Sequence, residues 1–263
     1  MQNDSVQLTM EGPLARITLN RPARLNAMDL AWIEGLNEAV DRLVEDPAAA
    51  VVLIRGAGRA FCAGLDLDML EASGMPAGFY EGQERAFRNL ERLDAITIAA
   101  IHGYCLGGGV QLAIACDLRV CSSDAVLGLP AVNEGLFPGM APFRLPRLVG
   151  LGAASRLVLS GEEVDAGEAL RLGLVDYLAP AERFDDELRT VLERYLRAPR
   201  AASVSSKRLM RRAFEGTFDE VYAESLPLLR ECLASPEVAA AREAWQQRSG
   251  AAARRLTPRS PTP

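Results

Sequence analysis

Two glycine-containing segments hold the residues best suited to chemistry in this sequence. Residues 60–67 (AFCAGLDL) and residues 105–111 (CLGGGVQ) each have the pattern of a strand that stops at glycine before a turn or helix. The first N–H groups of a helix have no partner inside the helix and lie at its positive end. If both turns face one site, two N–H donors surround one oxygen. This is how an oxyanion such as a thioester enolate is stabilised.

The two segments, in this order and with these flanks, resemble the crotonase (enoyl-CoA hydratase/isomerase) superfamily. Further similarity lies in residues 16–22, 25–28, 115–119, 127–138 and 161–176. The resemblance implies an α/β fold, a crotonase-like spiral of ββα units with a C-terminal helical region. It also implies an enzyme of fatty acid metabolism that acts on acyl-CoA thioesters. Coenzyme A would be part of the substrate, and neither a separate cofactor nor a metal is expected.

By position in the motifs, the backbone N–H groups of Leu65 and Gly108 would form the oxyanion hole. Gly108 would lie near the N-terminus of a helix that continues through Ala113, so the helix dipole would add to the hydrogen bond. The side chain of Leu65 matters little to this role, because the donor belongs to the main chain. The alternative interpretation is that these glycines only permit tight packing of strand against helix.

The catalytic side chains depart from the family pattern. A hydratase of this family carries two glutamates that hold water and move its protons, and those positions are Gln111 and Ala131 here. Glutamine can hold a water but cannot exchange a proton at neutral pH, and alanine can do neither. A further acidic position, used by isomerases and related hydrolases, is Gly139. The sequence therefore argues against two-glutamate hydration and favours isomerisation or other enolate chemistry, including decarboxylation or hydrolysis. A non-catalytic acyl-CoA binder is the alternative.

Replacement proton carriers must come from nearby acids. Glu134 lies three residues beyond Ala131 and would return to the same side on a helical turn. A half-buried carboxylate there would favour its neutral form and could carry a proton, although a surface glutamate is the alternative. We interpret Glu81 and Glu84 as part of a solvated helix face. His102, the only histidine, ends an apolar strand, and we interpret it as serving turn geometry.

The resemblance also implies which residues meet the substrate. Arg24 and Leu25 would meet the adenine and phosphates, with the Ala63 main chain on the other side of the nucleotide. The full expected substrate-binding set is Arg24, Leu25, Ala63, Asp66, Leu67, Asp68, Ala131, Lys207 and Phe214. Asp66 and Asp68 could instead cap or pair locally. Ordinary surface charge is the alternative for Arg24 and Lys207, and core packing is the alternative for Phe214.

The composition excludes several classes of protein. The chain has 263 residues, is 49% hydrophobic and carries a net charge of −6, which gives no support for a nucleic-acid partner. No apolar run approaches the length of a membrane span. The five cysteines form no metal-binding spacing and are expected to be small buried residues in a reducing cytosol. We therefore expect a cytoplasmic protein without a membrane partner.

Hydrophobic patterns predict where the elements lie. We expect a hairpin over residues 7–19, a helix from Asp29 to Val44, and buried parallel strands at 51–54, 96–101 and 118–121. Helices are expected over residues 203–214, 218–233 and 237–248. The predicted organisation is an α/β core over 1–200, a helical oligomerisation or lid region over 201–250, and a disordered tail over 251–263. The resemblance implies a homotrimer or a dimer of trimers.

Overall fold

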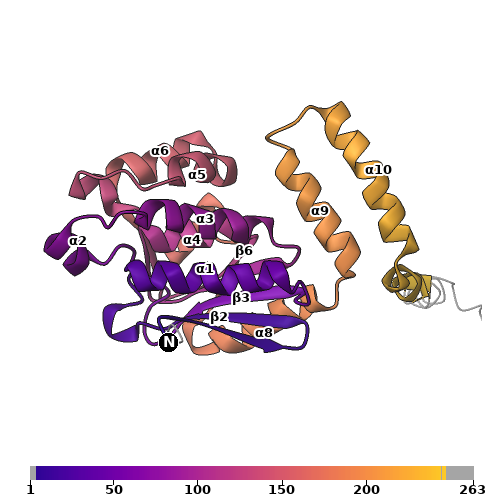
Figure 1. Cartoon of the computed structure of the whole chain (residues 1–263), viewed down its shortest axis with the longest axis horizontal. Helices are drawn as coiled ribbons and strands as arrows, with labels where there is room; N and C mark the ends of the chain where they lie inside the picture. Colours follow the sequence, from indigo (N-terminus) through magenta and orange to yellow (C-terminus); the bar gives the residue numbers. More distant parts are fainter. Residues whose placement is uncertain (1–3, 244, 247–263) are drawn as a thin grey trace, which may run out of the picture. The chain divides into compact units, whose positions relative to one another are not determined.

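The computed structural model of the chain describes residues 4–243 and 245–246 (Figure 1). It forms two compact units, Met1–Leu196 and Arg197–Pro263. The predicted disordered tail over residues 251–263 lies outside the described residues. None of the described helices is long and apolar enough to cross a membrane.

The first unit is built on a six-stranded sheet in the order β1-β2-β3-β4-β6-β9. Its strands are β1 (Val6–Glu11), β2 (Leu14–Leu19), β3 (Val51–Gly56), β4 (Ile96–Ile101), β6 (Leu118–Ser122) and β9 (Tyr177–Ala179). The first two pair antiparallel, and every later pair is parallel. The inner strands are apolar runs buried on both faces, as a covered parallel sheet requires. The predicted hairpin and parallel strands are therefore confirmed.

A second, smaller sheet has the order β5-β7-β8. Its strands are β5 (Tyr104–Leu106), β7 (Val126–Gly128) and β8 (Glu163–Asp165). Isolated parallel bridges between Cys62 and Cys105, and between Met28 and Leu65, continue this layer along the earlier turns of the chain. Each turn therefore contributes first to the large sheet and then to the second layer. This arrangement confirms the expected α/β spiral of ββα units.

Helices on both faces of the large sheet complete the core. The helices of this unit are η1 (Pro22–Arg24), α1 (Leu30–Glu45), α2 (Leu67–Ser73), α3 (Phe79–Arg92), α4 (Gly108–Ala115), η2 (Pro130–Glu134), α5 (Ala141–Val149), α6 (Leu151–Ser160), α7 (Ala166–Leu172), η3 (Ala181–Arg183) and α8 (Phe184–Leu196). In Figure 1, α1, α3 and α4 lie on one side of the sheet and α8 on the other. Asp29 caps α1 by accepting a 2.8 Å hydrogen bond from the Trp32 N–H. Near the end of α1, Leu43 is buried and Val44 is 56% exposed.

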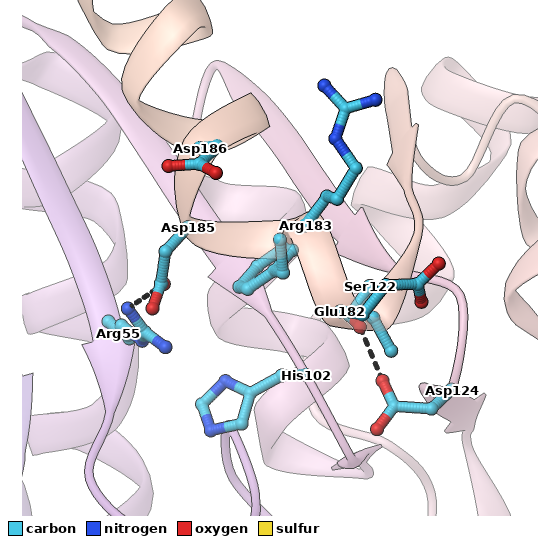
Figure 2. Close-up of a pocket in the computed structure, with 10 residues that line it drawn as sticks. Arg55, His102, Ser122, Asp124, Glu182, Arg183, Asp185 and Asp186 are labelled. Atoms are coloured by element: carbon cyan, nitrogen blue, oxygen red, sulfur yellow. Dashed lines mark hydrogen bonds and ion pairs between the residues drawn. The ribbon is translucent and has the colours of Figure 1, made fainter.

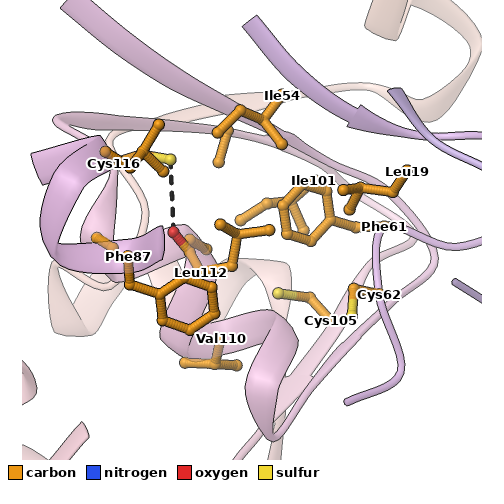
Figure 3. Packing of buried hydrophobic residues seen from close by; sticks show 14 of the residues in the cluster. Leu19, Ile54, Phe61, Cys62, Phe87, Ile101, Cys105, Val110, Leu112 and Cys116 are labelled. Atoms are coloured by element: carbon orange, nitrogen blue, oxygen red, sulfur yellow. Dashed lines mark hydrogen bonds between the residues drawn. The ribbon is translucent and has the colours of Figure 1, made fainter. Parts of the chain in front are cut away.

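The interior between the large sheet, α3 and α4 is closely packed (Figure 3). Phe61, Phe87 and Leu112 are fully buried there, together with several cysteines. Burial raises the pKa of the Cys62 thiol to about 12, so it remains a neutral apolar group beside the first glycine segment. The expectation that cysteines fill the core is confirmed for four of the five, since Cys232 is only half-buried.

The second unit contains two long helices, α9 (Arg200–Arg212) and α10 (Phe218–Ala234). A capping box begins α10, because Thr217 and Glu220 bond each other's backbone N–H groups. Helix α9 ends before Phe214, which lies in the turn, so the predicted extension to that residue is wrong. Residues 236–243 are also helical, while the predicted end of this third helix lies outside the described residues. The trimer or dimer of trimers stays a prediction.

Candidate active site

The first glycine segment is held in place by backbone hydrogen bonds from two other turns. The Met28 N–H donates to the Gly64 carbonyl at 2.7 Å, and the Asp66 N–H donates to the Met28 carbonyl at 3.0 Å. The Leu106 N–H donates to the Cys62 carbonyl at 2.9 Å. Three loops that are distant in sequence are thereby fixed side by side, and the backbone around Leu65 is part of this array.

The two segments approach so closely that only glycine fits between them. A Cβ on Gly64 would lie 2.9 Å from the Leu106 carbonyl oxygen and 3.3 Å from the Gly108 nitrogen, and Gly64 has a φ of +94°. A Cβ on Gly109 would lie 2.2 Å from the Cys62 carbonyl oxygen. The glycines therefore do permit tight packing, as the alternative interpretation required. The same packing brings the Gly108 nitrogen against the residue that immediately precedes Leu65.

Two backbone donors remain open at this junction. In the described part of the chain, neither the Leu65 N–H nor the Gly108 N–H donates to another group. Gly108 is the first residue of α4, so its N–H lies at the positive end of that helix. Gly107 makes the turn possible with φ +50° and ψ −112°, and its own N–H donates to the Gly128 carbonyl at 2.9 Å. That these two donors hold one negatively polarised oxygen stays a prediction.

Gln111 lies one turn further along α4 and is buried. Its Oε1 accepts a hydrogen bond from Gln83 Nε2 at 3.4 Å. A Cβ on Gly139 would lie 2.3 Å from the same Oε1 and 3.2 Å from Cε2 of Tyr80. The structure thus brings together Gln111 and Gly139, two positions where the resemblance implies acidic residues, and neither carries a proton-transferring group. Gly139 also has a φ of +45°, so a larger side chain could not enter without displacing its neighbours.

Glu134 is exposed, which agrees with its interpretation as a surface glutamate and not with a half-buried carboxylate. It ends the short 3-10 helix η2, in which residues three apart lie on one side, and Ala131 is half-buried in the same helix. The prediction that Ala131 and Glu134 lie on the same side of the helix is therefore correct, but the Glu134 end of that side faces solvent. The role of Glu134 as a proton carrier stays a prediction.

Comparison with known proteins agrees with this geometry. Residues 9–249 match the family described as enoyl-CoA hydratase/isomerase. A short-chain-enoyl-CoA hydratase from Clostridium acetobutylicum is 31% identical over 241 residues, covering 90% of this chain and 92% of that protein. A crotonyl-CoA hydratase from Syntrophomonas wolfei is 32% identical, covering 90% and 93%. A crystal structure of an enoyl-CoA hydratase from Mycobacterium smegmatis has a TM-score of 0.85 at 30% identity, covering 93% of this chain and 96% of that one.

The chain belongs to the enoyl-CoA hydratase/isomerase family.

In this enoyl-CoA hydratase/isomerase family member, Glu84 pairs with another helix instead of facing solvent. Glu84 Oε2 lies 2.8 Å from Arg144 Nη1, and Glu91 Oε1 lies 2.6 Å from Arg144 Nε. Burial acts to lower the pKa of Arg144, but hydrogen bonds and charge from Glu91 and Glu84 outweigh it and raise that pKa. The interpretation of Glu84 as a solvated residue is therefore wrong, because α5 covers its side of α3. Glu81 is exposed, as expected.

The expected nucleotide-binding turn contains several local contacts. Arg24 is ion-paired with Asp68, and both side chains are exposed. The Ala63 N–H donates to the Leu25 carbonyl at 3.0 Å, so this N–H is already used within the protein. Leu67 is 46% exposed. The structure brings these residues together on one side of the first glycine segment, and their contact with a nucleotide stays a prediction.

Asp66 has a structural role that the sequence left as an alternative. It is buried, caps α2 by accepting from the Met69 N–H, and lies 3.0 Å from Arg21 Nη2. Burial acts to raise the pKa of Asp66, but the hydrogen bonds from Arg21 and Met69 outweigh this and lower it. The ionised carboxylate therefore fixes the backbone that follows Leu65.

Sequence reasoning missed Asn26, Arg21 and Gln83. Asn26 is fully buried with a φ of +57° and accepts from the Arg21 N–H at 2.8 Å. Its Nδ2 donates to the carbonyls of Ala57 at 2.9 Å and Ala60 at 2.8 Å. Asparagine tolerates this left-handed conformation better than most residues, which is the one local signal available. Asn26 thereby ties the turn containing Leu25 to the start of the first glycine segment.

Lys207 and Phe214 belong to the second unit, so their expected contacts with coenzyme A stay predictions.

His102 lies in a different place, a surface cavity of about 270 Å³ at the carboxyl ends of β3, β4 and β6 (Figure 2). Its Nε2 lies 3.1 Å from the Gly58 carbonyl oxygen, and its ring lies 6.3 Å from that of Phe184. Arg55 pairs with Asp185 across the same cavity at 2.5 Å. None of the predicted catalytic or substrate-binding residues lines this cavity. The interpretation of His102 as a turn residue fits these contacts.

Proposed function

We propose that this protein binds acyl-CoA thioesters and stabilises their enolates with the backbone N–H groups of Leu65 and Gly108. The observation that carries the proposal is the junction of the two glycine segments, where both N–H groups are unused within the described part of the chain. Family membership and the acyl-CoA substrates named for the relatives support the same assignment. The dipole of α4 adds to the field at the Gly108 N–H.

The reaction we propose is enolate chemistry other than two-glutamate hydration. Gln111 and Ala131 occupy the two expected glutamate positions, and neither side chain exchanges a proton at neutral pH. Isomerisation needs only one group that removes and returns a proton, and decarboxylation forms the enolate without removing one. The same replacements favour a second candidate, a non-catalytic acyl-CoA binder. Turnover with enoyl-CoA, malonyl-type CoA and β-hydroxyacyl-CoA substrates, followed by mass spectrometry, distinguishes the candidates.

Binding should depend on the thioester carbonyl. Acetyl-CoA should bind more tightly than free CoA, because each of the two N–H donors contributes about 1 kcal/mol to ground-state binding. Titration calorimetry with the two ligands measures the difference directly. Equal affinities would show that the two donors do not hold the carbonyl oxygen.

The proposed role of Glu134 has its own test. Glu134→Gln should abolish exchange of the α-proton of an acyl-CoA in deuterated water while leaving CoA binding intact, because glutamine cannot transfer protons. Mass spectrometry of the recovered acyl-CoA measures the exchange. Glu81→Gln, the same change at another exposed glutamate, serves as the control and should exchange normally. Unchanged exchange in Glu134→Gln would make Glu134 a surface residue only.

A further inference from the structure

The orientation of the Gln111 side-chain amide follows from its contacts with Gln83 and Gly139. Gln83 Nε2 donates to Gln111 Oε1 at 3.4 Å, and because this pair of amides would also be satisfied with both reversed, the contact with Gly139 decides the orientation. The second contact comes from Gly139, whose missing Cβ would lie 2.3 Å from Oε1. One Cα–H bond of glycine points along the Cβ direction, so Oε1 accepts a weak Cα–H···O contact there. An NH₂ group at this position would direct its hydrogens against the Cα–H.

The other end of the amide is left as a donor. Gln111 is 5% exposed, and its Nε2 has no hydrogen-bond partner in the described part of the chain. Other atoms do not enclose this nitrogen completely, so Nε2 retains accessible surface. Gln111 follows Gly108 by three residues on α4, which places the two on neighbouring positions of one helix face. Helical side chains lean toward the N-terminus, and the Gly108 N–H projects from that end, so both donors lie toward the N-terminal end of α4.

The charge near this donor selects among acceptors. Arg144 is held by both Glu84 and Glu91, so the three groups together carry a net negative charge. The ring edge of Tyr80 lies 3.2 Å from the position that a Cβ on Gly139 would take. Burial, and then the charge of Glu84, raises the pKa of Tyr80, while the charge of Arg144 acts in the opposite direction. A carboxylate on the acyl chain would be repelled here, whereas a neutral carbonyl oxygen would not.

We propose that Gln111 Nε2 is a specificity-determining donor that recognises a neutral carbonyl oxygen on the acyl chain, so that the preferred substrate class is 3-oxoacyl-CoA. This inference rests on the proposed function, since the thioester carbonyl must first be held by Leu65 and Gly108. Glutamate at this position would present only acceptors when ionised, whereas the glutamine here presents a donor. Gln83 and Gly139 both contact the Oε1 end of this amide, so Nε2 is the end left for the substrate.

The test compares acetoacetyl-CoA with butyryl-CoA, which has a methylene in place of the second carbonyl. We expect the wild-type protein to prefer acetoacetyl-CoA, and Gln83→Glu to reduce this preference by about fivefold, the equivalent of one hydrogen bond. The introduced carboxylate accepts from Gln111 Nε2 and turns its oxygen toward the substrate. Calorimetry at neutral pH keeps this carboxyl ionised while the acetoacetyl group stays largely in its neutral form. Gln83→Met, of similar volume, is the matched control and should keep most of the preference.

The outcomes separate this inference from the proposed function. The inference is supported if Gln83→Glu lowers the preference for acetoacetyl-CoA and leaves the affinity for butyryl-CoA unchanged. A merely structural role of Gln83 would lower the affinity for both ligands. Wild-type preference in both variants, or no preference in the wild type, overturns the inference alone. If butyryl-CoA binds no better than free CoA, the proposed function fails, and the inference fails with it.

Discussion

The double variant Gln111→Glu with Ala131→Glu should hydrate crotonyl-CoA about 10²–10⁴-fold faster than the wild-type protein, the range for a positioned acid or base. Gln111→Glu is nearly isosteric, and a glutamate there can still accept from Gln83. Ala131 is half-buried in η2, so a longer side chain has room to extend. The measurement is the initial rate of loss of enoyl absorbance.

Each single variant serves as a control for the double variant. Gln111→Glu alone and Ala131→Glu alone should gain much less, because each leaves one of the two expected glutamate positions without a carboxylate. Hydration by the wild-type protein at ordinary family rates would contradict this account, because it would require a proton carrier that neither position supplies.

Removing one oxyanion donor should cost about 10²–10³-fold in the rate of any enolate reaction that the protein catalyses. Gly108→Pro removes the N–H at the first position of α4, where proline is well tolerated in helices. A Cβ on Gly108 would lie 2.7 Å from Met28 Sδ, the flexible end of a side chain that can move aside. The rate of α-proton exchange in deuterated water measures the effect.

Gly108→Ala is the matched control for this variant. It introduces the same Cβ against Met28 but keeps the backbone N–H, so the difference between the two variants reports the loss of the donor together with the proline Cδ that replaces its hydrogen. Similar losses in Gly108→Ala and Gly108→Pro would mean that steric displacement, and not the hydrogen bond, causes the effect. Circular dichroism checks that both variants are folded.

Much of the fold could be predicted because its signals are local. The apolar runs of β3 and β4 are bounded by turns, and Asp29 stands immediately before α1. The glycine segments were recognisable for the same reason, since a positive φ at Gly64 and the close approach at Gly109 allow no other residue. Where backbone geometry dictates the residue type, the residue type in turn indicates the geometry.

The surroundings of Gln111 could not be predicted, because they depend on segments that meet only in the folded chain. Gln83 comes from α3 and Gly139 from the turn before α5, and neither is near Gln111 in sequence. Glu84 was misjudged for the same reason, since its partner Arg144 lies on another helix. The exposure of Glu134 could not be predicted for a different reason. Helical spacing correctly placed it on the side of Ala131, but how much of its side chain is exposed depends on which other segments cover η2.

The central claim is that the Leu65 and Gly108 N–H groups polarise a thioester carbonyl, and infrared difference spectroscopy tests it most directly. With isotope-labelled acetyl-CoA, the carbonyl stretch should move to lower frequency on binding to the wild-type protein, because hydrogen bonds weaken the C=O bond. The shift should be largely lost in Gly108→Pro and kept in Gly108→Ala. An unchanged carbonyl frequency in the saturated wild-type complex would contradict the account.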